Sequence, residues 1–317
     1  MKKLAALALA SAMVVTSAAT VFAGDLNFTT GGDQGTYYGF GSVLAGQITN
    51  NTDTKVTAIT SGGSQANIDA LDMGDAEFAF VQSDVMSYAY QGTNTFEDYG
   101  YEIDCFSTVA ALYMEQVQIV TCDPEIKTVA DLAGKNVSIG APGSGVYFNA
   151  IDILNAYDLT EEDINPTYES FGDSADSLTD GKIDAAFVTA GAPTTAVTSL
   201  GASKDIYLVS IDDEHMASLL ESCPYYSENV IAADVYGLSE DTTTVAVGAV
   251  VVAHDDVSDD DVYNFVSTIF ENVDAIKTAH AKGAELDLEF AASVTDVPYH
   301  PGAAKYFEEK GLEVPTK

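Results

Sequence analysis

The sequence contains no arginine and no tryptophan, and all 12 of its basic residues are lysines. Without a guanidinium group, the protein cannot form the two parallel hydrogen bonds by which arginine commonly holds a carboxylate or a phosphate. We therefore expect any acidic ligand to be held by backbone N–H groups, hydroxyl groups, amides or a lysine.

Positive charge is also scarce. The chain has 49 acidic residues and a formal net charge of −37. A surface with that charge repels nucleic acids and anionic lipids, so we expect neither as a partner. The simplest interpretation is an acidic, well-solvated exterior, and we expect a monomer that binds a small-molecule solute.

The usual motifs of enzymes and metal sites are missing. Gly140–Gly145 has the glycine spacing of a phosphate-binding loop, but Val146 and Tyr147 follow in place of the lysine and the hydroxyl residue. No G-x-S-x-G motif occurs, and the four histidines have no partner at metal-ligand spacing. We expect no catalytic residues, no metal ion and no cofactor.

The three cysteines, Cys105, Cys122 and Cys223, do not have the spacing of a metal site. A disulfide between Cys105 and Cys122 would bracket a predicted strand, and three buried thiols are the alternative. The sequence leaves both possibilities open.

Glycine is concentrated in a strand, loop and helix unit that occurs twice, at Leu26–Ile48 and Val137–Leu159. In each copy a short run of β-formers leads into glycines, and an amphipathic stretch follows. Unpaired N–H groups at a helix start, reached through a glycine loop, favour a bound anion. Two such units suggest two similar domains that hold one ligand between them.

The N-terminus has the features of an export signal. Lys2 and Lys3 precede an apolar run, Leu4–Val15, and Val21-Phe22-Ala23 is typical of a cleavage site. We predict that residues 1–23 are a cleaved signal peptide and that the protein is periplasmic; an uncleaved anchor is the alternative. The first cysteine is Cys105, which excludes a lipid-modified cysteine at the cleavage site.

The order of predicted elements favours an α/β fold. After the first unit come a strand at 55–60, a helix at 65–73 and a strand at 77–81. The second unit is followed by a strand at 166–171, a helix at 174–180 and a strand at 183–189. Alternation of this kind is typical of parallel sheets flanked by helices. We predict a two-lobe, type II-like periplasmic binding protein fold.

Two segments have enough length to connect the lobes. Residues 106–112 and 116–121 are predicted strands joined by residues 113–115, and residues 243–253 form a long apolar strand. We predict lobe I at 24–112 plus 250–317, lobe II at 117–244, and hinge segments at 113–116 and 245–249. A single helix is predicted at 258–280, and a last helix at 303–310.

Polar residues collect where the predicted strands end, which is the edge at which open α/β sheets bind ligands. We predict that the carboxylate of a solute contacts backbone N–H groups at Ser144–Val146. For Glu115 we weigh a contact with a ligand ammonium group against a structural role at the hinge. The predicted ligand-binding residues are Thr36, Tyr37, Ser64, Gln82, Ser83, Tyr113, Glu115, Ser144, Gly145, Thr189 and Ala190.

Eight short stretches resemble, in the same order, those of a known family. They are Gly35–Tyr38, Val81–Asp84, Leu112–Glu115, Ser138–Gly145, Ser170-Phe171, Asp180–Asp184, Thr189–Pro193 and His300–Ala303. With them the sequence resembles the TAXI class of solute-binding receptors, which serve tripartite ATP-independent periplasmic (TRAP) transporters. The resemblance implies two lobes that close on a solute such as glutamate, glutamine or a dicarboxylate, and delivery to a TRAP membrane permease.

Two departures from the family pattern lie near the expected cleft. Gln118 stands where a histidine is common, and Asp33-Gln34 stands where glycine or threonine is usual. The family's ligand therefore cannot be transferred directly. Two further functions stay open: a ligand sensor for a membrane signalling partner, and an enzyme on the same scaffold. The enzyme would need a nucleophile–base pair or a metal cluster, and the sequence contains no pattern for either.

Overall fold

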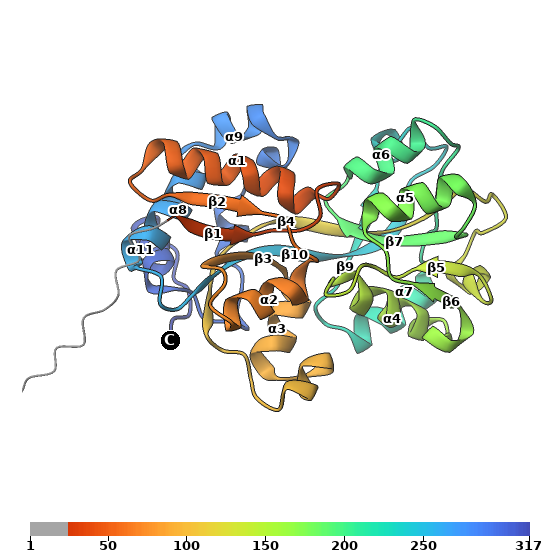
Figure 1. Ribbon diagram of the computed structural model, residues 1–317, viewed down its shortest axis with the longest axis horizontal. Coiled ribbons are helices and arrows are strands. Elements are labelled where there is room, and N and C mark those ends of the chain that lie inside the picture. Colours follow the sequence, from red (N-terminus) through yellow and green to blue (C-terminus); the bar gives the residue numbers. More distant parts are fainter. Residues whose placement is uncertain (1–24) are drawn as a thin grey trace, which may run out of the picture.

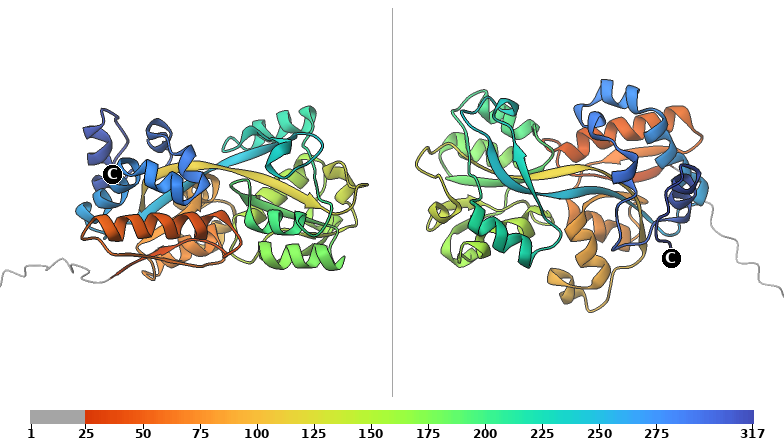
Figure 2. Two further views of the ribbon diagram at one scale, coloured as in Figure 1. Left: turned by 90° about the horizontal axis from the view of Figure 1, so that it is seen from above. Right: turned by 180° about the vertical axis from the view of Figure 1, so that it is seen from behind.

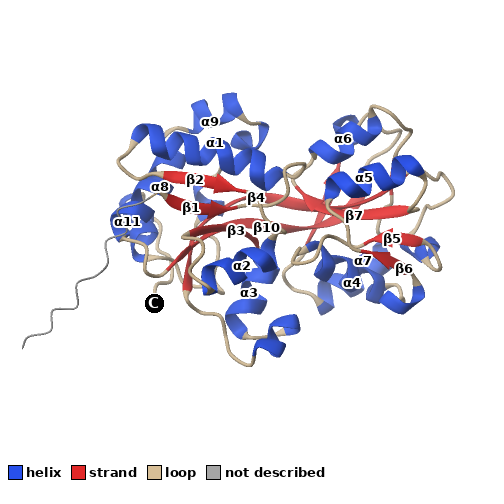
Figure 3. Ribbon diagram, in the orientation of Figure 1, coloured by secondary structure: helices blue, strands red, loops and turns tan. Residues whose placement is uncertain are grey.

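The computed structural model describes residues 25–317 and shows an α/β fold of two lobes (Figure 1). The predicted signal peptide, residues 1–23, lies outside the described residues. Each lobe has a mainly parallel sheet covered by helices on both faces (Figure 3). The predicted fold class is therefore confirmed.

In the first lobe, β1 lies between β2 and β3, and all three strands are parallel. Their helices form because apolar residues recur at helical spacing; Tyr37, Phe40, Leu44 and Ile48 form the buried face of the first one. The elements are β1 Leu26–Thr29, α1 Thr36–Asn51, β2 Val56–Ile59, α2 Ser64–Asp72, β3 Phe78–Gln82, α3 Ser83–Gln91 and the 3₁₀ helix η1 Asn94–Tyr99.

The second lobe repeats this order, with β5 between β6 and β7 and all three parallel. A capping box formed by Thr128 and Asp131 begins η2. The elements are η2 Val129–Leu132, β5 Asn136–Ser138, α4 Val146–Ala156, η3 Glu161–Asp163, β6 Asn165–Thr167, α5 Phe171–Asp180, β7 Ala185–Ala190, α6 Thr195–Gly201, β8 Tyr207–Leu208, α7 Asp213–Ser222, β9 Ser227–Ile231 and η4 Ala233–Val235.

Two long antiparallel strands, β4 Phe106–Thr121 and β10 Thr242–His254, run through both lobes. They give one continuous sheet in the order β2-β1-β3-β10-β4-β7-β5-β6, and Figure 2 shows the pair side by side along the molecule. The prediction of two separate strands joined at residues 113–115 is wrong, because residues 106–121 form one strand. The β4 backbone stays hydrogen-bonded to β10 through Glu115, which pairs with Val247.

The C-terminal part packs on the first lobe. The predicted single helix at 258–280 is in fact two, because the first ends at Glu271 and the next begins at Val273, with Asn272 between them. The elements are α8 Asp259–Glu271, α9 Val273–Ala279, η5 Ala281–Glu285, α10 Leu288–Ala291 and α11 Pro301–Glu309.

The apolar cores change from one lobe to the other along the two long strands. On β4, Tyr113 belongs to the core of the first lobe and Val117 to that of the second. On β10, Val247 packs in the second core and Ala249 in the first. The hinge segments predicted at 113–116 and 245–249 fall on this change, and we keep them as a proposal about motion.

The three cysteines are half-buried free thiols, so the Cys105–Cys122 disulfide is not formed. Within residues 25–317 no helix has the length and apolar character needed to cross a bilayer. The same residues contain no group of three or more histidine, cysteine or acidic side chains that could hold a metal ion.

The packing of α11 on α8 gives a test of the fold. A Cβ added at Gly302 would lie 2.2 Å from the backbone oxygen of Asp259. We expect Gly302→Ala to lower the free energy of unfolding by about 1–3 kcal/mol, because the helices must move apart. A Cβ at Gly46, inside α1, would meet nothing within 4 Å. Gly46→Ala should therefore be neutral or stabilising by up to about 1 kcal/mol. Urea unfolding of both variants checks this, and equal effects would contradict it.

Candidate functional site

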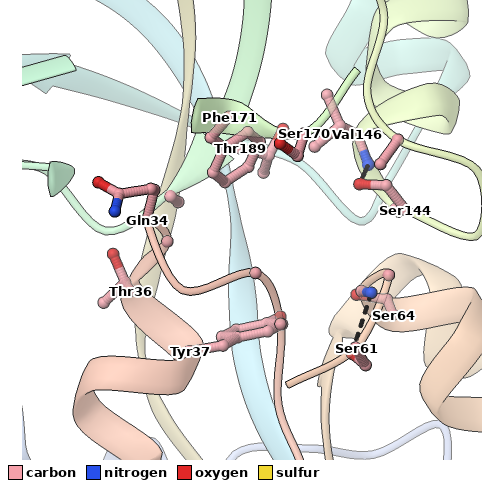
Figure 4. A pocket seen from close by; sticks show the side chains of 18 of the residues that line it. Gln34, Thr36, Tyr37, Ser61, Ser64, Ser144, Val146, Ser170, Phe171 and Thr189 are labelled. Atoms are coloured by element: carbon pink, nitrogen blue, oxygen red, sulfur yellow. Dashed lines mark hydrogen bonds between the residues drawn. The ribbon is translucent and has the colours of Figure 1, made fainter. Parts of the chain in front are cut away.

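A cavity lies between the lobes, at the carboxyl ends of the parallel strands. The cavity has a volume of about 90 Å³. Figure 4 shows side chains from both lobes around it, with Thr36 and Tyr37 on one side and Ser144 and Thr189 on the other. The cavity therefore forms where an open α/β sheet is expected to bind a ligand.

Nine of the eleven predicted site residues line this one cavity. They are Thr36, Tyr37, Ser64, Gln82, Glu115, Ser144, Gly145, Thr189 and Ala190. They come from separate strand ends in both halves of the chain, and their role in binding stays a prediction.

Ser83 and Tyr113 do not line the cavity. The Ser83 hydroxyl instead accepts a hydrogen bond from the Gly248 N–H at 3.0 Å, which ties the start of α3 to β10. Tyr113 is buried behind the cavity. The Lys282 ammonium group lies 5.4 Å from the centre of the Tyr113 ring. Side chains alternate across a strand, so Glu115 and Tyr113 point to the same face, but only Glu115 reaches the cavity.

Three helices begin at the cavity with a glycine in the N-cap position. The caps are Gly35 for α1, Gly63 for α2 and Gly145 for α4, and none of these helices has a side-chain N-cap hydrogen bond from the described chain. The first-turn N–H groups of a helix have no partner within the helix, and together they carry a partial positive charge. Three such ends at one cavity create a positive potential there without any basic side chain.

Sequence reasoning missed the start of α5 as part of the site. Ser170, Phe171 and Gly172 line the cavity, although residues 166–171 were predicted to form a strand. The Ser170 hydroxyl accepts a hydrogen bond from the Asp173 N–H, which is the sign of a helix N-cap. The S-x-x-D spacing was the available signal for a helix that begins at Phe171.

The glycine loops of the two lobes are in direct contact beside the cavity. The Ala66 N–H donates to the Gly143 oxygen at 3.0 Å, across the boundary between the lobes. A Cβ at Gly62 would lie 2.8 Å from the Pro142 oxygen, and one at Gly145 would overlap Gln82 Oε1. The glycines therefore allow the lobes to approach closely, and the structure has a closed cleft.

Glu115 is the buried acid in the cavity wall. Its side chain is 2% exposed, and the Tyr37 hydroxyl donates a 2.5 Å hydrogen bond to its Oε2. Burial raises the pKa of Glu115 to about 8; the charge of Asp84 adds to this, whereas the Tyr37 hydrogen bond and the Lys282 charge oppose it. Glu115 therefore carries a proton at neutral pH in this closed form.

The sequence matches the NMT1-like family over residues 28–311. The chain belongs to that family. The match includes every residue that lines the cavity.

Solved structures support the fold of this NMT1-like protein. A protein from Bordetella bronchiseptica RB50 has 15% identity and a TM-score of 0.56, with 90% of this chain and 98% of that chain covered. A proposed L-cystine ABC transporter protein from Listeria monocytogenes has 16% identity and a TM-score of 0.52, with coverages of 83% and 98%. The zinc-bound ligand-binding component of an ABC-type import system from Staphylococcus aureus has 11% identity and a TM-score of 0.50, with coverages of 92% and 93%.

The Tyr37 hydrogen bond can be tested by titration. Because this donor stabilises the charged carboxylate, Tyr37→Phe should raise the pKa of Glu115 above its value of about 8 in the unchanged protein. Carboxyl ¹³C NMR over a pH series measures both values. Tyr263→Phe is the control, because Tyr263 donates to the exposed Glu309 on the far side of the first lobe. An unchanged or lower pKa in Tyr37→Phe would contradict the assignment.

Proposed function

We propose that this NMT1-like protein is a periplasmic, non-enzymatic receptor that binds a small carboxylate-bearing solute between its lobes and delivers it to a TRAP-type membrane permease. The observation that carries the proposal is the set of three glycine-capped helix starts at one cavity between the lobes. Exposed first-turn N–H groups are hydrogen-bond donors for an anion.

The composition of the cavity wall supports a ligand that is held by the backbone. Of the described residues, no lysine or histidine lines the cavity, and its two acids are Asp33 and Glu115. Burial keeps Glu115 protonated at neutral pH, which removes one of the two negative charges. Charge-assisted hydrogen bonds from N–H and hydroxyl groups to a carboxylate are roughly twice as strong as neutral ones.

The size of the cavity supports a ligand like an amino acid or a short dicarboxylate. A cavity needs at least about 10–15 Å³ to hold one water, so 90 Å³ has room for several waters or for a small solute. Glutamate, glutamine and five-carbon dicarboxylates, each with about ten non-hydrogen atoms, are small solutes of this kind. Larger solutes such as nucleotides would require the lobes to separate.

The TRAP assignment rests on the sequence resemblance. Six of the eight resembling stretches contribute residues to the cavity wall: Gly35–Tyr38, Val81–Asp84, Leu112–Glu115, Ser138–Gly145, Ser170-Phe171 and Thr189–Pro193. A shared pattern around the ligand cavity supports a shared mode of binding. Two of the structural matches are named as ABC transport proteins. At 11–16% identity, these matches indicate only the fold.

The proposal is tested by identifying the ligand. Mass spectrometry of the solute released when the purified protein is denatured should show a small carboxylic acid or amino acid. Calorimetry with L-glutamate, L-glutamine, 2-oxoglutarate and succinate then gives affinities. Reconstitution with a TRAP-type permease tests delivery. A released nucleotide, sugar or metal ion would overturn the proposed ligand class.

The Ser144 hydroxyl provides a first variant. It lies at the start of α4, where it accepts a 3.2 Å hydrogen bond from the Val146 N–H and lines the cavity. If it also donates to the ligand carboxylate, Ser144→Ala should weaken binding by about 1.5–3 kcal/mol. Ser42→Ala is the matched control, since the Ser42 hydroxyl is exposed on α1 and donates to the Tyr38 oxygen. Unchanged calorimetric affinity in Ser144→Ala would contradict the assigned contact.

Glu115→Gln separates the two classes of carboxylate ligand. An ammonium group beside Glu115 would favour its ionised form, and the glutamine variant lacks that charge. We therefore expect Glu115→Gln to weaken L-glutamate at least tenfold more than 2-oxoglutarate if the natural ligand is an amino acid. Equal losses for both solutes would assign Glu115 a structural role through its hydrogen bond with Tyr37.

A further inference from the structure

A buried hydrogen-bond network links the cavity to the interface between the lobes. Its centre is Asn149 on α4, which is fully buried. The Asn149 Oδ1 accepts from Gln82 Nε2 at 2.7 Å and from the Thr189 hydroxyl at 2.8 Å. Its Nδ2 donates to Asp84 Oδ2 and to the Tyr226 hydroxyl, each at 2.9 Å. All four hydrogen-bonding positions of the amide are therefore occupied.

The network crosses from one lobe to the other. Gln82 and Asp84 lie at the end of β3 and the start of α3, whereas Asn149, Thr189 and Tyr226 belong to the second lobe. Gln82 and Thr189 also line the ligand cavity. Asn149 is thus a positioning residue that forms its four bonds together only when the lobes are closed.

Asp84 is the member of this network that has an oxygen without a hydrogen-bond partner in the described part of the chain. Its side chain is fully buried, and its Oδ1 has no hydrogen-bond partner among residues 25–317. Its Oδ2 accepts from Asn149 Nδ2 of the opposite lobe, and Asn149 also donates to the Tyr226 hydroxyl of that lobe. A buried carboxylate oxygen without a donor is costly when charged, and a proton on that oxygen removes the charge.

We propose that Asn149 couples closure of the lobes to the protonation of Asp84: closing the cleft takes up one proton from water onto Asp84 Oδ1, and opening releases it. The inference rests on the proposed function only in that the two lobes separate. The inference adds the uptake of a proton to the binding cycle. It also assigns a role to Asn149, which does not line the cavity.

The electrostatics of the closed form agree with this geometry. Burial raises the pKa of Asp84 to about 7 and the charge of Asp152 adds to it, while hydrogen bonds from the Val85 backbone and Asn149 oppose it. Every titratable group around Asp84 is an acid, a phenol or a thiol. They are Tyr88 on α3, Glu115 on β4, Asp152 on α4, and Cys223, Tyr225 and Tyr226 before β9.

The sign of the pH effect follows from the two pKa values. The carboxyl has a raised pKa when closed and an ordinary one, near 3.8, when exposed to water in the open form. The closed form is therefore favoured below the raised value, and this advantage is lost as the pH rises toward and through 7. From pH 6 to pH 8.5 the contribution of Asp84 to the closed-to-open ratio should fall roughly tenfold, with little further change in that contribution above pH 8.5.

The experiment measures closure and titration in the same ligand-free samples. Small-angle X-ray scattering between pH 6 and pH 8.5 gives the closed fraction, and carboxyl ¹³C NMR gives the pKa of Asp84. Glu115 also has a pKa raised by burial in the closed form, so the contribution of Asp84 is measured in a Glu115→Gln background. We expect the closed fraction of Glu115→Gln to fall with pH, and that of the double variant Asp84→Asn/Glu115→Gln to stay at its pH 6 level throughout, because the two amides resemble the protonated acids.

Two variants serve as controls. Asp84→Asn alone leaves Glu115 in place and should keep the pH-dependent change that comes from Glu115. Asp260→Asn removes an exposed charge from the first turn of α8 and should behave like the unchanged protein. If Asp84→Asn does not fold, the NMR titration of the unchanged protein decides alone.

Three outcomes would overturn the inference: an ordinary pKa for Asp84, a pH dependence that is the same in Glu115→Gln and in Asp84→Asn/Glu115→Gln, or an unchanging open form from pH 6 to pH 8.5. Neither measurement uses a solute, so these failures leave the proposed carboxylate binding untouched. Conversely, failure of every solute in the calorimetric series would leave the proton linkage standing.

Discussion

The continuous pairing of β4 with β10 is the constraint on which the rest of the structure depends. Because both strands run through both lobes, the parallel halves on either side belong to one sheet. The carboxyl ends of β1, β2 and β3 therefore face those of β5 and β7 across the same gap (Figure 1). Each of these strands is followed by a helix, so helix starts converge on the gap. The cavity is a consequence of the topology, before any particular side chain is considered.

The absence of arginine is compatible with this arrangement. A receptor that binds its ligand through first-turn N–H groups needs backbone geometry in place of a cationic side chain. Glycine at the three N-caps permits close approach and supplies no side-chain cap. Two of the first-turn N–H groups are bonded within the protein, that of Ala66 to the Gly143 oxygen and that of Val146 to the Ser144 hydroxyl, and the others are the proposed donors to the ligand. The same glycines allow the loops of the two lobes to touch, as the contact between Ala66 and Gly143 shows. Ligand binding and closure thus depend on the same short segments.

Much of the fold and of the candidate site was predictable, because both depend on local sequence patterns. Strands, glycine loops and amphipathic helices give a periodic signal, and most predicted site residues lie at strand ends that the parallel topology brings together. Ser83 and Tyr113 were misplaced because the direction of a side chain near a strand end depends on packing. Ser83 bonds to β10, and Tyr113 packs in the first core. The role of Asn149 was not predictable, because its four partners are far apart in the sequence and meet only in the closed fold.

The proposed binding of an anion by this acidic protein requires that negative charge be limited at the point of contact. Most of the 49 acidic residues lie far from the cavity, and salt screens exposed charges beyond about 10 Å at ~0.1 M. Glu115 in the cavity wall and Asp84 in the network beside it are buried and cannot be screened in this way. Burial raises their pKa values to about 8 and about 7, so protonation removes their charge where screening fails. The helix ends can then dominate the local potential, and closing the cleft strengthens their effect because it removes water from around the ligand.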